Sequence, residues 1–133
     1  MKTYLDAGVL LSAWKPGELH ARAIAIMEDA TREFFTSDAV KLELLPKPIF
    51  EKHRMEVEFY NAHFSDAADS EPFSAEWGRD ALALAKKHGL AAIDALHLAS
   101  AIRQGADEFV TSELTGKPMF RVGGIKVVSL RAA

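Results

Sequence analysis

The sequence contains no cysteine among its 133 residues. Disulfides, thiolate zinc sites and cysteine nucleophiles are therefore excluded, and the composition fits a reducing compartment. Any metal ion must be bound by oxygen or imidazole ligands.

Long apolar runs are also lacking. No stretch approaches the length of a membrane span, and an acidic residue, Asp6, comes too early for a signal peptide. We therefore expect a soluble, cytoplasmic protein that does not associate with membranes.

An excess of positive charge is the third missing feature. Sixteen Lys and Arg residues are outnumbered by 19 Asp and Glu residues, which gives a net charge of −3. Proteins that coat nucleic acid neutralise many phosphates with basic side chains, so this class is disfavoured. A contact with RNA would have to be local, and a divalent cation held by carboxylates would supply part of its positive charge.

Hydrophobic residues make up 49% of the chain and are spread from Tyr4 to Leu130, without a low-complexity tract or a repeat. A chain of this length is close to the common size of one domain and can bury a core of its own. We therefore predict a single domain spanning residues 1–133.

Strand-like and helix-like patterns alternate along the chain. The predicted strands are residues 2–5, 33–36, 69–71, 108–111 and 125–130. The predicted helices are a short one after Asp6 and residues 18–31, 38–45, 49–64, 75–88 and 93–104. This alternation predicts an α/β fold with a central, mostly parallel sheet flanked by helices.

Acidic residues stand at the ends of several predicted elements. Asp6 follows the first strand and Glu113 follows the strand 108–111. Both therefore fall at the carboxyl ends of strands, where α/β sheets usually bind ligands. Asp94 lies in the first turn of a helix that is apolar almost all round, where a buried charge is costly without a partner or a metal.

A cluster of such carboxylates would need a compensating charge. Two unit charges about 4 Å apart repel by roughly 4 kcal/mol at an effective dielectric near 20. Magnesium prefers oxygen ligands, and a bound ion can lower the pKa of a water and orient a phosphate. Acidic residues at element ends are more often helix caps or solvated surface charges, so spacing alone leaves both interpretations open.

Several segments resemble the conserved blocks of the PIN domain family. Residues 92–101, AIDALHLASA, and residues 105–113, GADEFVTSE, are similar to the third and fourth blocks. Residues 4–11 resemble the first block, residues 37–44 the second, and residues 125–130 the closing strand. The resemblance covers nearly the whole chain and implies a three-layer PIN-like fold.

The resemblance also implies a function and a set of site residues. The acidic quartet of the family falls on Asp6, Glu43, Asp94 and Glu113. The first three are the implied ligands of Mg²⁺ or Mn²⁺ in an endoribonuclease, and Glu113 would assist. The size of the chain looks most like the VapC toxins of toxin–antitoxin pairs, which implies a homodimer, an RNA substrate and an antitoxin partner.

Some of these residues have plainer interpretations. Glu43 lies near lysines and fits an ordinary solvated helical face. His97 is one turn from Asp94 and could contact RNA or carry a proton, but a hydrogen-bonded core histidine is the better interpretation. Thr111 and Ser112 are candidates for bonding a carboxylate or a phosphate, or for finishing a turn.

Two positions depart from the family pattern. Gly8 stands where a small polar residue is usual, and Glu113 stands where an aspartate is usual. The extra methylene of Glu113 moves its carboxylate by about 1.5 Å. These departures motivate a second hypothesis, a catalytically impaired PIN-fold protein that acts by binding protein or RNA. A third, a phosphatase of the haloacid-dehalogenase type with Asp6 as nucleophile, is disfavoured because Gly8 replaces its second aspartate.

Overall fold

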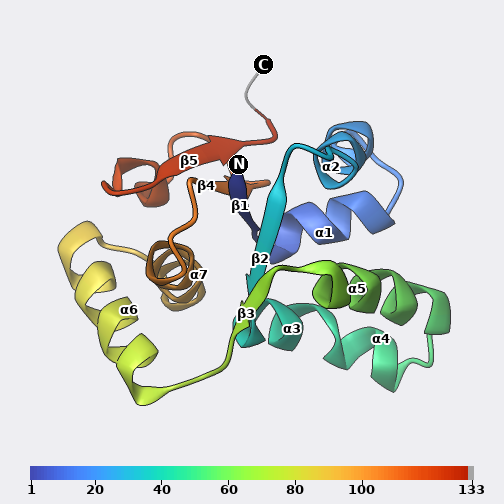
Figure 1. Ribbon diagram of the computed structural model, residues 1–133, viewed down its shortest axis with the longest axis horizontal. Helices are drawn as coiled ribbons and strands as arrows, with labels where there is room; N and C mark the ends of the chain where they lie inside the picture. The colour runs from blue at the N-terminus through green and yellow to red at the C-terminus, as the bar shows by residue number, and fades with distance from the viewer. Residues whose placement is uncertain (132–133) are drawn as a thin grey trace.

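A five-stranded parallel sheet forms the centre of the molecule (Figure 1). The computed structural model describes residues 1–131, so residues 132 and 133 of the predicted single domain lie outside the described residues. The strands are β1 (Lys2–Leu5), β2 (Glu33–Ser37), β3 (Asp69–Glu71), β4 (Glu108–Thr111) and β5 (Lys126–Ser129). The predicted α/β fold is confirmed, and every strand pairing is parallel.

The strand order creates a topological switch point near the centre of the sheet, between β1 and β4. The order is β3-β2-β1-β4-β5, so the chain builds outward from β1 on one side and then adds β4 and β5 on the other. Open α/β sheets bind ligands at such a switch point, beyond the carboxyl ends of the strands. The residues that follow β1 and β4 lie at this position.

Seven α-helices flank the sheet within residues 1–131. They are α1 (Ala7–Trp14), α2 (His20–Met27), α3 (Asp38–Leu44), α4 (Pro46–Phe50), α5 (Arg54–Asp66), α6 (Ala75–His88) and α7 (Ala92–Arg103). Helix α7 lies on one side of the sheet with α6 packed outside it, while α1, α2 and α5 lie on the other side (Figure 1). None of the helices in the described part of the chain is long and apolar enough to cross a membrane.

Serine and glycine residues set several helix ends as predicted. The side chains of Ser37 and Ser74 accept hydrogen bonds from the amides of Val40 and Trp77 at 3.4 and 3.1 Å. Helix α6 ends at Gly89, whose φ is 68°. Glycine adopts this left-handed conformation without steric cost, so it ends the helix.

The predicted helix over residues 49–64 is wrong in its first turn. Ile49 belongs to the short helix α4, and α5 begins only at Arg54. Between them Lys52 adopts a φ of 60°, and the amide of His53 donates to the carbonyl of Pro48 at 2.8 Å. Residues 51–54, EKHR, contain no apolar side chain, so the apolar pattern carries no signal at the break itself. A 3₁₀ helix, Pro118–Arg121, was also not predicted.

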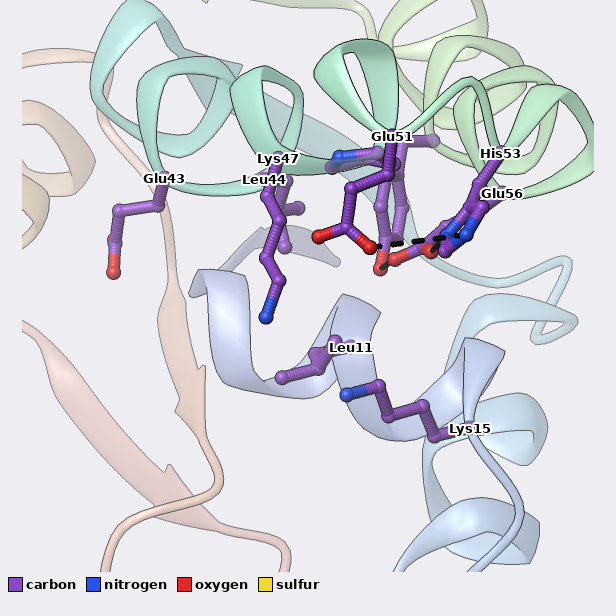
Figure 2. Close-up of a pocket in the computed structure, with 10 residues that line it drawn as sticks. Leu11, Lys15, Glu43, Leu44, Lys47, Glu51, His53 and Glu56 are labelled. Carbon is purple, nitrogen blue, oxygen red and sulfur yellow. Dashed lines mark hydrogen bonds and ion pairs between the residues drawn. The ribbon is translucent and has the colours of Figure 1, made fainter.

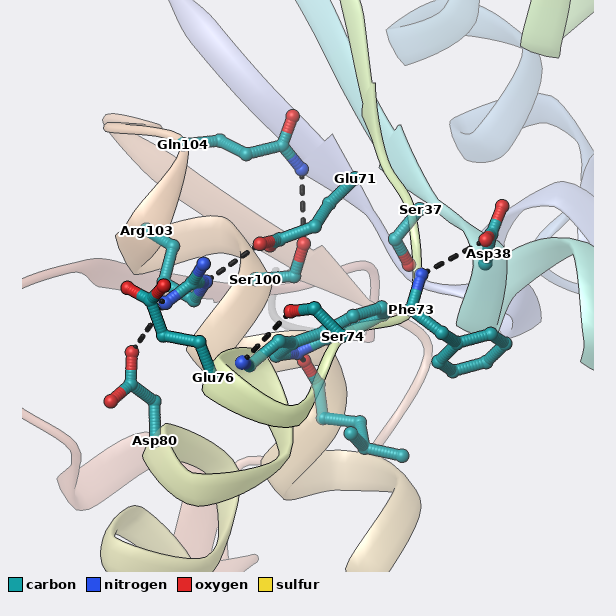
Figure 3. A network of polar contacts seen from close by, with 12 residues as sticks. Ser37, Asp38, Glu71, Phe73, Ser74, Glu76, Asp80, Ser100, Arg103 and Gln104 are labelled. Carbon is teal, nitrogen blue, oxygen red and sulfur yellow. Dashed lines mark hydrogen bonds and ion pairs between the residues drawn. The ribbon is translucent and has the colours of Figure 1, made fainter.

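A charged network ties the edge strand to the helices on one side of the sheet (Figure 3). Arg103, at the end of α7, donates to Glu71 on β3 and to Asp80 on α6, both at 2.6 Å. These carboxylates hold the pKa of Arg103 well above its usual range. The network fixes α7, which carries Asp94 in its first turn, relative to α6 and the sheet.

Candidate functional site

Asp6 lies directly after β1 and caps helix α1. One carboxylate oxygen accepts a hydrogen bond from the amide of Val9 at 3.1 Å, and the other accepts one from the hydroxyl of Thr111. The side chain is therefore held by the start of α1 and the end of β4, and Asp6 is only 8% exposed. Thr111 thus bonds a carboxylate, one of the two roles predicted for it.

The buried carboxylate of Asp6 is short of positive charge. Burial raises the pKa of Asp6 to about 6, against the opposing effects of the Thr111 and Val9 hydrogen bonds. Neither of its two hydrogen-bond partners carries a positive charge. A buried anion in this position is stabilised by a nearby cation.

Asp94 occupies the first turn of α7 and is half-buried. Burial raises the pKa of Asp94, and the charges of Glu113 and Glu43 raise it further, while Lys117 opposes them. Glu43 also raises the pKa of Asp6. The four acids predicted from the sequence are therefore linked in series, with Glu43 acting on both Asp6 and Asp94 and with Glu113 acting on Asp94. We call these four acids and their surroundings the acidic edge.

Glu43 extends from α3 and is held by His97 of α7. The imidazole Nε2 lies within hydrogen-bond distance of the Glu43 carboxylate, and Nδ1 lies 2.9 Å from the hydroxyl of Tyr4. His97 is 3% exposed. The prediction that His97 is a hydrogen-bonded core histidine is confirmed, and it has no surface available for contact with RNA.

Glu113 follows β4 and is exposed. Its amide donates to the hydroxyl of Thr111 at 3.1 Å, and its carbonyl accepts from Ser129 at 2.6 Å. The backbone is therefore fixed while the carboxylate extends to solvent. Of the four predicted acids, Asp6 and Asp94 are the more buried, and Glu43 and Glu113 lie around them.

Ser112 occupies the space that a side chain at position 8 would need. A Cβ atom built on Gly8 would lie 2.2 Å from the Ser112 hydroxyl oxygen and 3.4 Å from a carboxylate oxygen of Asp6. The missing polar group at position 8 is therefore replaced by a hydroxyl from the other end of the chain. Sequence patterns could not reveal this pairing, because only the fold brings the two residues together.

Replacing Gly8 with serine is expected to destabilise the protein by about 1–3 kcal/mol, because the new Cβ collides with Ser112. Adding Ser112→Gly removes the obstructing hydroxyl and should recover most of this loss in chemical unfolding. The control is Gly78→Ala in α6, where an added Cβ meets nothing within 4 Å. This control should stabilise the protein by about 0.5–1 kcal/mol. Strictly additive effects of Gly8→Ser and Ser112→Gly would contradict the contact.

The donor set of the acidic edge suits a hard divalent cation. Its acidic side chains offer oxygen ligands, and the two more buried acids both have raised pKa values. Within residues 1–131, no three His, Asp or Glu side chains are arranged to hold one ion together. Magnesium commonly takes only one or two protein carboxylates and keeps several waters, so Asp6 and Asp94 fit such an ion.

A cavity of about 340 Å³ adjoins the acidic edge (Figure 2). Glu43 lies at one end of it, and Lys15 and Lys47 extend into it from opposite walls. At the other end His53 lies 3.8 Å from Glu51 and 3.7 Å from Glu56. The cavity therefore presents both signs of charge beside the acids.

The fold and the acidic edge define a class of protein, a parallel α/β domain with carboxylates at the switch point of its sheet. The sequence model of the PIN domain matches residues 3–113. The chain therefore belongs to the PIN domain family. No curated protein sequence matches it.

Several solved structures have a similar fold. A toxin–antitoxin complex from Klebsiella pneumoniae is 18% identical, with a TM-score of 0.72 and coverage of 98% of this chain and 99% of that one. VapBC2 from Rickettsia felis, bound to a promoter DNA fragment, is also 18% identical, with a TM-score of 0.71 and coverage of 97% and 98%. FitAcB from Neisseria gonorrhoeae is 20% identical, with a TM-score of 0.65 and coverage of 96% and 97%.

Proposed function

We propose that this protein is a Mg²⁺- or Mn²⁺-dependent endoribonuclease and the toxin of a toxin–antitoxin pair. The observation that carries the proposal is the buried carboxylate of Asp6 at the switch point of the sheet, together with Glu43, whose charge acts on both Asp6 and the half-buried Asp94. The pKa of each is raised by burial. Membership of the PIN domain family and the fold shared with toxin–antitoxin complexes support the same function.

In this proposal Asp6 and Asp94 hold the ion, and Glu43 completes its ligands once the ion is bound, since without it no three acidic side chains in residues 1–131 converge on one point. When bound, the ion supplies positive charge for the phosphate and lowers the pKa of a water. Thr111 and the amide of Val9 keep the Asp6 carboxylate in one orientation. Glu113, exposed next to Asp94, would orient the attacking water and accept its proton.

The RNA strand would pass along the cavity beside Glu43. Lys15 and Lys47 extend into this cavity from opposite walls, so they are placed to contact phosphates of the strand on the Glu43 side of the acidic edge (Figure 2). Such a contact is local, which suits a chain whose net charge is −3. The substrate is cytoplasmic RNA.

The partners would be an antitoxin and a second copy of the chain. Large apolar side chains are exposed on α4 and at the start of α5, where Phe50 is 87% and Met55 is 74% exposed. Surfaces of this kind are usually covered by a partner. The similar folds in solved toxin–antitoxin complexes support a small antitoxin as that partner.

The proposed function is tested by titrating Mn²⁺ into the purified protein and assaying cleavage of a random-sequence RNA pool on the same sample. We expect Mn²⁺ binding and cleavage that stops when EDTA is added. A folded protein that neither binds Mn²⁺ nor cleaves RNA would contradict the proposal.

A second candidate function is a PIN-fold protein that has lost efficient catalysis and acts by binding protein or RNA. The observation in its favour is that no three His, Asp or Glu side chains in the described residues are arranged around one point. Metal affinity separates the two functions. RNA or antitoxin binding that persists without any measurable Mn²⁺ binding would favour this candidate.

A further inference from the structure

Three buried side chains, those of Ser37, Tyr4 and His97, form one chain of hydrogen bonds that ends at the exposed carboxylate of Glu43. The amide of Val40 donates to the Ser37 hydroxyl at 3.4 Å, and this hydroxyl lies 2.7 Å from that of Tyr4. The Tyr4 hydroxyl lies 2.9 Å from Nδ1 of His97, whose Nε2 contacts the Glu43 carboxylate. We infer that this chain runs in one direction and makes His97 a positioning residue for Glu43.

The direction of these hydrogen bonds follows from the groups at the two ends of the series, the Val40 amide and the Glu43 carboxylate. An ionised carboxylate only accepts hydrogen bonds, so Nε2 of His97 must donate to Glu43. Among the hydrogen bonds of the described residues, the Ser37 hydroxyl has the Tyr4 oxygen as its acceptor, so the Tyr4 hydroxyl donates in turn to Nδ1 of His97, and the imidazole carries its N–H on Nε2. The Tyr4 oxygen then accepts from Ser37, whose own oxygen already accepts from the amide of Val40. Every group in the chain is satisfied in this one arrangement.

Burial makes this arrangement difficult to replace. Tyr4 and Ser37 are fully buried and His97 is 3% exposed, so water cannot substitute for a missing partner at low cost. By contrast, the Glu43 side chain is 36% exposed and lies on the surface of α3. The buried chain therefore restrains an otherwise mobile carboxylate.

The chain of hydrogen bonds also joins the strand and helices that carry the acids. Ser37 ends β2 and caps α3, which carries Glu43, while His97 lies one turn after Asp94 on α7. Tyr4 lies two residues before Asp6 on β1. A single set of hydrogen bonds thus fixes α3 and α7 against β1, and with them the relative positions of three acids.

His97 does not itself touch substrate in this assignment. Both of its ring nitrogens are occupied by protein partners, and its ring packs beside those of Tyr4 and Phe109. Its contribution passes through Glu43. The inference rests on the proposed function only where it treats Glu43 as a metal ligand.

The first test is the tautomer of His97 in the metal-free protein, read from its ring ¹⁵N chemical shifts. We expect the neutral form with the proton on Nε2, and we expect Tyr4→Phe to give a mixture of tautomers because Nδ1 loses its donor. A proton on Nδ1, or a ring protonated at both nitrogens near pH 7, would overturn the assigned direction. This measurement does not depend on metal binding or activity.

The second test is Mn²⁺ affinity measured by calorimetry. His97→Leu should weaken binding by about 10- to 100-fold, as does loss of a group that orients a metal ligand. His97→Gln, whose amide N–H can still reach Glu43, should keep more of the affinity, and Tyr4→Phe should fall between Gln and the wild type. In a Glu43→Ala background, His97→Gln and Tyr4→Phe should have no further effect.

Tyr60→Phe is the matched control for Tyr4→Phe. Tyr60 is also fully buried, but its hydroxyl donates to Glu56 at 2.7 Å, away from this chain. It should leave Mn²⁺ affinity unchanged. Full Mn²⁺ affinity in a folded His97→Leu variant, or in a folded Tyr4→Phe variant whose His97 tautomer has changed, would overturn the positioning role. Absence of Mn²⁺ binding by the wild type would contradict the proposed function instead.

Discussion

Replacing Asp94 with asparagine is expected to lower the rate of RNA cleavage by about 100-fold or more, with the fold intact. In the proposed function this carboxylate binds the ion and offsets its charge, and an amide cannot do so. Loss of a ligand of the ion weakens the positive charge that stabilises the reacting phosphate, and electrostatic stabilisation of this kind typically contributes a factor of this size. The rate is measured in single-turnover cleavage of a random-sequence RNA pool at saturating Mn²⁺.

Asp94 is better suited to this test than Asp6. Asp6 caps α1 and accepts the hydrogen bond of Thr111, so its substitution changes structure as well as chemistry. Asp94→Asn removes a carboxylate whose pKa is raised by burial and by the charge of Glu113, so its negative charge is unfavourable in the metal-free protein. The metal-free variant should therefore be as stable as the wild type or more stable, since the loss of a favourable helix-dipole interaction is small.

Glu28→Gln is the matched control for the loss of one carboxylate. Glu28 is exposed and lies at the end of α2, on the approach to the amino end of β2 and away from the acidic edge. The cleavage rate and Mn²⁺ affinity of the Glu28→Gln variant should equal those of the wild type. Undiminished metal-dependent cleavage by folded Asp94→Asn would remove Asp94 from the site.

The location of the acidic edge could be predicted because it depends on topology. An aspartate directly after a parallel strand must lie at the carboxyl edge of the sheet, and the register pairs Leu5 of β1 with Val110 of β4. Asp6 and Thr111 therefore meet across two strands that the sequence already indicated. The roles of the four acids remain predictions until metal binding is measured.

Contacts that depend on side-chain direction could not be predicted in the same way. The sequence gives no sign that Ser112 fills the space beside Gly8, or that His97 reaches Glu43, which is 54 residues away. The break at Lys52 was hidden for a related reason, since the apolar period does not report a single left-handed residue. Periodicity records which face is buried, whereas these features depend on individual atoms.

Lowering the pH from 7.5 to 5 is expected to cost about 2 kcal/mol of stability through His63 alone. His63 lies on α5 and is 6% exposed, and within residues 1–131 its Nε2 has no hydrogen-bond partner. Its ring packs against those of Phe34 and Phe64, with centroids 5.6 and 5.9 Å away. Burial in these surroundings lowers the pKa of His63 to about 4, although Asp66 opposes the shift.

The sign follows from proton binding in the two states. At pH 7.5 the ring is neutral in both the folded and the unfolded protein, so its titration contributes nothing. Below the unfolded pKa of about 6.5 the unfolded chain binds a proton that the folded protein excludes, and stability falls. The loss reaches about 2 kcal/mol at pH 5 and about 3 kcal/mol at pH 4, where the folded ring begins to titrate.

The effect of His63 is isolated by comparing unfolding free energies of the wild type, His63→Phe and His63→Leu across this pH range. The comparison is needed because the raised pKa of Asp6 acts in the opposite sense, stabilising the folded state as the pH falls. A packing change at position 63 displaces a curve by the same amount at every pH, whereas loss of the titration changes its slope. We expect both variants to lose about 2 kcal/mol less than the wild type between pH 7.5 and 5. Curves that stay parallel over this range would show that His63 is protonated as readily in the folded protein as in the unfolded chain.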